Sequence, residues 1–246
     1  MMKRVDGRAV NELRPVTITP DYIVYPEGSV LISMGATKVL CNVSIEDIVP
    51  SWMRAQGISG GWVTGEYALL PRSTQRRTPR ETLKLGGRTQ EIRRLIGRSL
   101  RAAVDLDLLG PRTCIIDCDV LQADGGTRTA AVTGGYVALA IAINKLVQED
   151  KLPPNVMKKI ITAVSVGVVD NVAMLDLCYA EDSIAEVDIN VVMTSGGEFI
   201  EIQGTAEKSP FSRAMLDQLL GLAIKGIVEL AEIQKNVIEN RWKKPG

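Results

Sequence analysis

The stretch DCDVLQADGGTRTAAVTGGYVALA, residues 117–140, decides the fold, because a strand-like segment stops there at two glycines and continues as a helix. Small and aliphatic residues from Thr129 to Leu146 predict a deeply buried helix that approaches a sheet closely. The first N–H groups of a helix have no partner within it, and the helix dipole adds partial positive charge there. The junction therefore suits an anion.

Two interpretations of this junction remain open. In the first, Gly125 and Gly126 adopt φ values that aim successive N–H groups into one concavity, Thr127 or Thr129 caps the helix, and Arg128 supplies a guanidinium suited to phosphate. In the second, the glycines only make a tight turn and Arg128 is solvated. Because neither GxxxxGK[ST] nor GxGxxG is present, the first interpretation favours a free anion over a bound nucleotide.

Composition restricts the class of protein. The chain has 246 residues, of which 46% are apolar, so we expect a globular protein with a sizeable core. No charged and apolar leader is seen at residues 1–6, and the longest apolar run, Tyr136–Ile143, is too short to span a bilayer. We expect a soluble, cytoplasmic protein without a membrane partner.

Histidine is absent, which excludes Ser-His-Asp and Cys-His catalysis and every histidine-containing metal site. Four cysteines are present. Cys114 and Cys118 lie four residues apart in an apolar stretch without a second close pair, so buried reduced thiols are expected rather than zinc ligands. Any chemistry must use carboxylates, arginine, lysine, hydroxyls or backbone groups.

Two strand-rich segments flank the central helices. Residues 22–47 contain apolar runs separated by Glu-Gly-Ser and Gly-Ala-Thr, and residues 161–205 repeat this pattern with turns at 170–171 and 195–197. Period-3.6 patterning predicts a helix over 88–106. A second long helix is predicted over about 209–240, beginning with Ser209-Pro210 as its N-cap and first-turn pair. Without a recognisable linker, we expect one α+β (mixed α/β) domain over residues 1–246.

Charge is strongly segregated along the chain although the formal net charge is zero. Residues 72–101 carry ten basic and two acidic side chains, a net charge of +8. Residues 170–201 carry eight acidic side chains and no lysine or arginine, a net charge of −8. Whether folding keeps a basic rim beside an acidic pocket depends on which faces these residues occupy.

The basic segment contains two elements of interest. Arg88 follows a second Gly-Gly pair at the start of a helix, which is either an ordinary helix start or, if it converges with Arg128, half of a phosphate site. The loop LLPRSTQRRTPRETLK, residues 69–84, is either a solvated face or a polyphosphate-binding segment, and we favour nucleic acid. The spaced arginines of this loop are Arg72, Arg76, Arg77 and Arg80.

The acidic segment contains the stretch CYAEDSIAEVDINVVM, residues 178–193. Strand alternation places Asp188 on a polar face, and Asp182 arrives from the preceding turn. These carboxylates either face solvent or serve a reacting centre, as ligands of a divalent metal or as an acid that protonates a leaving oxygen.

Long ordered segments carry a resemblance to a known family, among them RVDGRAVNELRPV, GWVTGEYALLPRSTQRRTPRE, GRTQEIRRLIGRSLRA, DCDVLQADGGTRTAAVTGGYVAL and LDLCYAEDSIAEVDINVVMT. In these segments the chain resembles the bacterial ribonuclease PH family from end to end. One departure is Arg93, where that family usually carries glutamine.

The resemblance implies a fold like domain 2 of ribosomal protein S5, a hexameric ring of dimers, and phosphate-dependent 3′-to-5′ trimming of tRNA precursors and of rRNA. It implies that Arg88, Gly126, Thr127 and Arg128 bind inorganic phosphate as co-substrate. Asp182 and Asp188 match the catalytic pair associated with Mg²⁺, and the arginines of residues 72–80 would guide RNA. The alternatives are a ring subunit that binds RNA without cutting it, as in exosome-like complexes, and a hydrolytic nuclease.

Overall fold

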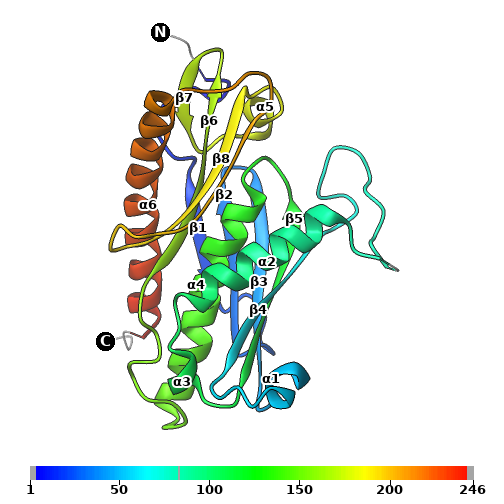
Figure 1. Cartoon of the computed structure of the whole chain (residues 1–246), viewed down its shortest axis with the longest axis vertical. Coiled ribbons are helices and arrows are strands. Elements are labelled where there is room, and N and C mark those ends of the chain that lie inside the picture. Colours follow the sequence, from blue (N-terminus) through cyan, green and yellow to red (C-terminus); the bar gives the residue numbers. More distant parts are fainter. Residues whose placement is uncertain (1–3, 83, 243–246) are drawn as a thin grey trace.

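The computed structural model describes residues 4–82 and 84–242, so residues 1–3 of the N-terminal segment considered above lie outside the described part. Two β-sheets and six helices make up the described chain (Figure 1). The first sheet has the order β1-β2-β3-β5-β4. Its strands are β1 (Val16–Pro20), β2 (Gly28–Met34), β3 (Thr37–Glu46), β4 (Trp62–Leu69) and β5 (Thr113–Gln122).

The second sheet is antiparallel, with the order β7-β6-β8-β9. Its strands are β6 (Ile161–Val169), β7 (Val172–Leu175), β8 (Val187–Thr194) and β9 (Phe199–Ala206). The expected turn between β6 and β7 is confirmed, since Asp170 and Asn171 both have positive φ, as a two-residue hairpin requires. The expected turn at 195–197 joins β8 to β9.

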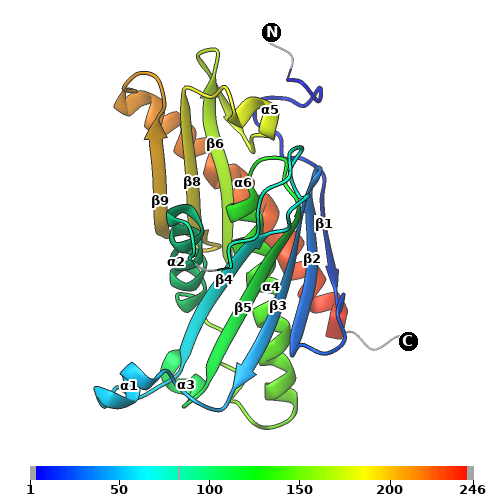
Figure 2. The ribbon, with the colours of Figure 1, turned by 90° about the vertical axis from the view of Figure 1, so that its right-hand side faces the viewer.

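Two long helices pack on these sheets. Helix α4 (Thr127–Gln148) lies against β2 and β3 of the first sheet and β6 of the second, and α6 (Arg213–Trp242) packs against β6, β7 and β1 (Figure 2). The other helices are α1 (Ser51–Ala55), α2 (Gly87–Arg101), α3 (Leu106–Leu109) and α5 (Tyr179–Asp182).

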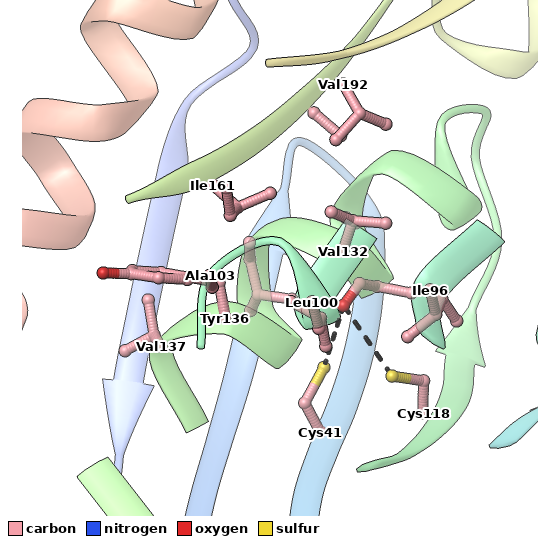
Figure 3. Close-up of a cluster of buried hydrophobic side chains, with 14 of the residues drawn as sticks. Cys41, Ile96, Leu100, Ala103, Cys118, Val132, Tyr136, Val137, Ile161 and Val192 are labelled. Carbon is pink, nitrogen blue, oxygen red and sulfur yellow. Dashed lines mark hydrogen bonds between the residues drawn. The ribbon is translucent and has the colours of Figure 1, made fainter. Parts of the chain in front are cut away.

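Helix α4 is the centre of the core. By length and composition it could cross a membrane, yet 78% of its most apolar window is buried inside the protein. Both sheets contact this helix. Val132 lies near Ile161 and Val192 of the second sheet (Figure 3). The thiols of Cys41 and Cys118, from the first sheet, donate to the carbonyl of Ala131. All four cysteines are free and buried, as expected.

Three expectations about the elements are wrong in detail. The apolar run at residues 22–25 is an exposed loop rather than a strand, and the first strand lies earlier, at Val16–Pro20. The helix expected over 88–106 ends at Arg101. The last helix begins at Arg213, not at Ser209-Pro210, because the hydroxyl of Ser212 accepts the N–H of Met215 and so starts the helix.

The pairing of β4 with β5 was not predicted. These strands run parallel, and the connection between them contains α2, which packs on β4. Parallel strands need such a crossover connection, and this one carries the arginine-rich loop and Arg88 from the end of β4 back across the sheet. The crossover therefore brings the basic segment to the junction between β5 and α4 (Figure 1).

Replacing Gly134 by alanine should lower the free energy of unfolding, because a Cβ there would lie 2.7 Å from Ile32 Cγ2 and 3.0 Å from Cys41 Sγ. Overpacking of this kind costs about 1–3 kcal/mol, which should exceed the gain in helix propensity. Urea denaturation measures the change.

The matched control is Gly221→Ala on the exposed side of α6, where a Cβ has nothing within 4 Å. It should stabilise the protein by about 0.5–1 kcal/mol. Equal stabilisation by both substitutions would show that α4 does not need the close approach.

Candidate functional site

A cavity of about 680 Å³ lies where the two sheets meet the start of α4. Three separate parts of the chain line it: the loop after β4, the Gly-Gly turn before α4, and the segment from α5 into β8. Most of the predicted site residues come together here. Those in the lining are Arg76, Arg77, Arg88, Gly126, Thr127, Arg128, Asp182 and Asp188.

The Gly-Gly turn has the conformation that the sequence suggested. Gly125 and Gly126 have φ values of 73° and 63°, and a Cβ on Gly125 would lie 2.5 Å from the carbonyl oxygen of Leu177. The carbonyl of Gly125 accepts hydrogen bonds from the Thr37 hydroxyl at 2.7 Å and from Arg14. The turn is thus tied through its carbonyl, on the side away from its N–H groups.

The expected side-chain cap on α4 is wrong. Thr129 Oγ1 donates to the carbonyl of Gly126 at 2.9 Å instead of accepting a first-turn N–H, and within the described residues α4 has no side-chain cap and no acidic residue in its first turn. The N–H groups at this end are therefore available to a bound anion, and the helix dipole favours one there.

Arg88 and Arg128 converge on the cavity from α2 and α4. One Nη of Arg128 donates to Glu91 Oε1 at 2.9 Å and to Gln203 Oε1 at 3.0 Å, which orients the guanidinium. Its other nitrogens donate to no protein acceptor in the described part of the chain. Arg88 is exposed at the second residue of α2. Two guanidinium groups therefore border one cavity.

Asp182 and Asp188 line the same cavity from α5 and β8. Burial raises the pKa of Asp182, and it raises the pKa of Asp188 to about 6, with a further contribution from the charge of Asp182. Arg88 and Arg128 act in the other direction on both carboxyls. The two acids are therefore close enough to one another and to both arginines to interact electrostatically.

The acidic pair fits Mg²⁺ only if other ligands complete the coordination. Among the described residues no group of three or more Asp, Glu or Cys side chains is placed to hold a metal ion. Mg²⁺ is often held by one or two carboxylates together with waters and substrate phosphate oxygens, and Asp182 and Asp188 offer the two carboxylates. The donors present therefore suit an ion that arrives with a phosphate ligand.

The arginine-rich loop is only partly in the cavity. It projects from the body between β4 and α2 (Figure 1), and its base is tied to the junction because the Ala123 N–H donates to the carbonyl of Ser73 at 2.8 Å. Arg76 and Arg77 line the cavity, whereas Arg72 and Arg80 are exposed outside the lining.

Sequence reasoning missed the buried ion pairs that hold this site together. Arg14 donates to both carboxylate oxygens of Asp176, at 2.7 and 3.0 Å, and also to the carbonyl of Asp124. Burial alone would lower the pKa of Arg14, but its bonds to Asp176 raise it. Arg4 donates to Glu181, next to Asp182, at 2.6 and 2.8 Å. The only signal in the sequence was the presence of arginines near the N-terminus and of an acidic segment about 160 residues later.

Further residues in the lining also escaped prediction. Ser165 and Asn190 are opposite one another on β6 and β8, and both face the cavity beside Asp188. Tyr179 and Asp124 complete the wall, with the Tyr179 N–H donating to Asp124 Oδ1 at 3.2 Å. Ser165 and Asn190 each alternate with apolar neighbours along their strands, and this pattern could have indicated that their side chains lie on a polar face.

Two family models match most of the chain. The model described as "3′ exoribonuclease family, domain 1" matches residues 12–143, and "3′ exoribonuclease family, domain 2" matches residues 159–226. The chain belongs to this exoribonuclease family. It is 56% identical over 238 residues to ribonuclease PH of Bacillus subtilis (strain 168) and 55% identical to ribonuclease PH of Bacillus cereus (strain G9842), in each case over 96% of both chains.

Two solved structures share the fold. Rice (Oryza sativa) Rrp46 superposes with a TM-score of 0.77 at 18% identity, covering 96% of this chain and 100% of that one. A chain of the Archaeoglobus fulgidus exosome with RNA bound to the active site superposes with a TM-score of 0.78 at 23% identity, covering 94% and 92%. The expected α+β fold is confirmed.

Asp188→Asn should stabilise the protein at neutral pH. Because the native pKa of Asp188, about 6, lies above the ordinary value of 3.8, the native state keeps this proton while the unfolded chain loses it, and stability falls as pH rises from about 4 to 6. The amide removes this loss, worth up to about 3 kcal/mol. Thermal melts in EDTA should show a higher Tm for the variant at pH 7 and little difference near pH 4.

Asp105→Asn is the control with the opposite sign. A hydrogen bond from Lys158 lowers the pKa of Asp105, so its substitution should reduce stability at neutral pH and lose that effect in acid. If Asp188→Asn lowered the Tm at pH 7 as Asp105→Asn does, burial would not dominate the environment of Asp188.

Proposed function

We propose that the cavity holds inorganic phosphate against the last phosphodiester of an RNA 3′ end, and that the two react there. Family membership and 56% identity to ribonuclease PH give the reaction class: the chain is a phosphorolytic 3′-to-5′ exoribonuclease. The observation that carries the proposed site is the convergence of Arg88, Arg128 and the uncapped start of α4 on one cavity.

Phosphate needs positioning and charge neutralisation more than it needs a base. It is already an anionic nucleophile, which accounts for a site without histidine. In the proposed site Arg88 and Arg128 hold its oxygens with charge-assisted hydrogen bonds, and Gly126, Thr127 and Arg128 add backbone N–H groups. Attack on the terminal phosphodiester then releases a nucleoside diphosphate.

The acidic pair stabilises the leaving 3′ oxygen in the proposed mechanism. In the proposed mechanism Asp182 and Asp188 lie beside this oxygen, where one donates a proton and the other holds Mg²⁺. When bound, Mg²⁺ would neutralise charge that develops on the oxygens of the reacting phosphate groups. Either carboxylate suits either role.

The substrate and the assembly are proposals that rest on the family. We propose that the chain trims the 3′ ends of tRNA precursors, and of rRNA, as a hexameric ring of dimers in the cytoplasm. Arg72, Arg76, Arg77 and Arg80 would contact the RNA backbone on its way to the cavity, because spaced guanidinium groups suit successive phosphates.

A ring subunit that binds RNA without cutting it is the alternative. Its support is limited to the fold shared with exosome chains of 22–23% identity. Against it, the cavity keeps both arginines and both aspartates. A hydrolytic nuclease would release monophosphates, whereas phosphorolysis releases diphosphates.

Trimming of a 3′-tailed RNA should require added phosphate, release nucleoside diphosphates, and reverse in excess diphosphate. Arg128→Ala should raise the KM for phosphate by about 10-fold or more and lower kcat, because it removes charge-assisted hydrogen bonds, while RNA affinity changes little. Product chromatography and initial rates against phosphate concentration measure both effects.

Arg112→Ala is the matched control, since this arginine pairs with Asp47 outside the cavity lining. It should leave the KM for phosphate unchanged. Unaltered trimming in phosphate-free buffer, with monophosphate products, would contradict the proposed reaction.

The triple substitution of Arg76, Arg77 and Arg80 by alanine should weaken RNA binding and leave the KM for phosphate nearly unchanged. If each contacts one phosphate of a single strand, the slope of log affinity against log salt should fall by about 2. Filter binding of a tRNA precursor across a salt series measures it, with Lys151→Ala as an exposed control. Normal binding and slope would show the loop to be merely solvated.

A further inference from the structure

Tyr67 is a buried phenol directly behind the proposed phosphate site. It lies on β4 opposite Cys118 of β5 and is only 4% exposed. Its hydroxyl is 2.8 Å from Thr127 Oγ1, the first residue of α4, and this is its only hydrogen-bond partner among residues 4–82 and 84–242. Thr127 in turn lines the cavity. The site described above makes no use of this contact.

The two hydroxyls share one hydrogen bond, and either could donate it. If Thr127 donated, the Tyr67 O–H would be left buried without an acceptor, which costs about 1–3 kcal/mol. If Tyr67 donates, its hydrogen is satisfied and the Thr127 hydrogen is left over. Thr127 can direct that hydrogen to an acceptor in the cavity, because its side chain lines the cavity. The burial of the phenol therefore favours Tyr67 as the donor.

We propose that Tyr67 is a positioning residue that fixes the Thr127 hydroxyl as a hydrogen-bond donor toward phosphate. A free threonine hydroxyl can rotate and can act as donor or acceptor. With its oxygen already accepting from Tyr67, the Thr127 hydroxyl has its hydrogen directed to the cavity side. The unprotonated oxygens of phosphate offer acceptors only, so this orientation matches them before phosphate binds. The inference rests on the proposed phosphate site and adds a residue that acts through Thr127.

Two features of the surroundings support this role. Burial raises the pKa of the Tyr67 phenol, so the group remains protonated and able to donate at physiological pH. Arg88 and Arg128 are both close enough to act electrostatically on the same phenol, which places it beside the two guanidinium groups of the proposed site.

Tyr67→Phe removes the donor with almost no change in shape. The KM for phosphate should rise by about 2- to 10-fold, the range of one hydrogen bond, while kcat at saturating phosphate and the KM for RNA change much less. Rates are measured at fixed RNA over a phosphate series, and an unchanged Tm verifies the fold. An unchanged KM would overturn the proposal. A lower KM would also overturn it, because it would mean that Thr127 had been donating to Tyr67 and was released.

Tyr136→Phe is the matched control, because Tyr136 is 5% exposed on α4 and its hydroxyl has no hydrogen bond in the described chain. Its loss should leave the KM for phosphate unchanged, and a rise equal to that of Tyr67→Phe would overturn the specific role of Tyr67. Thr127→Val should raise the KM at least as much as Tyr67→Phe.

The double variant of Tyr67→Phe and Thr127→Val separates action through Thr127 from an independent effect. Its KM should match that of Thr127→Val alone, since Tyr67 then has no hydroxyl to orient. Additive effects would overturn the proposal. Failure of the proposed function looks different: the unsubstituted protein would then trim RNA without phosphate, and no KM for phosphate could be measured.

Discussion

The buried ion pair between Arg14 and Asp176 is the interaction on which the site depends. The Arg14 side chain is 3% exposed and the Asp176 side chain is fully buried, and the guanidinium also binds the carbonyls of Asp124 and Gly125. One side chain therefore joins the N-terminal segment, the turn before α4 and the strand end that leads to α5. Loss of one partner from such a pair leaves an uncompensated buried charge, which typically costs 3–5 kcal/mol.

Ion pairing also explains what happens in the folded chain to the charges that are segregated along the sequence. Much of the acidic segment is neutralised by cations from elsewhere: Glu181 by Arg4, Asp176 by Arg14, and Glu201 by Arg98 at 2.9 Å. Within the basic segment, Arg93 is paired with Glu66, and Arg101 lies 4.3 Å from the centroid of the Trp62 ring. The opposition that reaches the cavity is local. It brings Arg76, Arg77, Arg88 and Arg128 into one cavity lining with Asp182 and Asp188.

Close packing at three glycines determines where the arginines and aspartates of the cavity meet. Gly28 faces the backbone of Ala138 and Gly134 faces Ile32, so α4 lies directly on β2 and β3. Gly125 then brings the turn against the carbonyl of Leu177 in the second sheet's connection to α5. Larger residues at these points would separate the sheets and move the helix start away from the acids. The glycines therefore allow the close approach of the Gly-Gly turn to Leu177 as well as the packing of the core.

By itself the sequence determined most of the elements, though not all of their bounds, and the chemistry they could carry. The period of residues 129–146, the Asp170-Asn171 turn and the alternation around Asp188 predicted a buried helix, a hairpin and a strand, because these signals are local. Long matching segments also indicated the family and the residues of the phosphate and acidic sites. Extension of this resemblance to one domain over residues 1–246 stays a prediction. Only the tertiary structure decided the parallel pairing of β4 with β5, the pairing of Arg14 with Asp176, and the burial of Tyr67 against Thr127. Each joins residues 51 to 162 positions apart, and such contacts depend on how sheets and helices pack rather than on any local pattern.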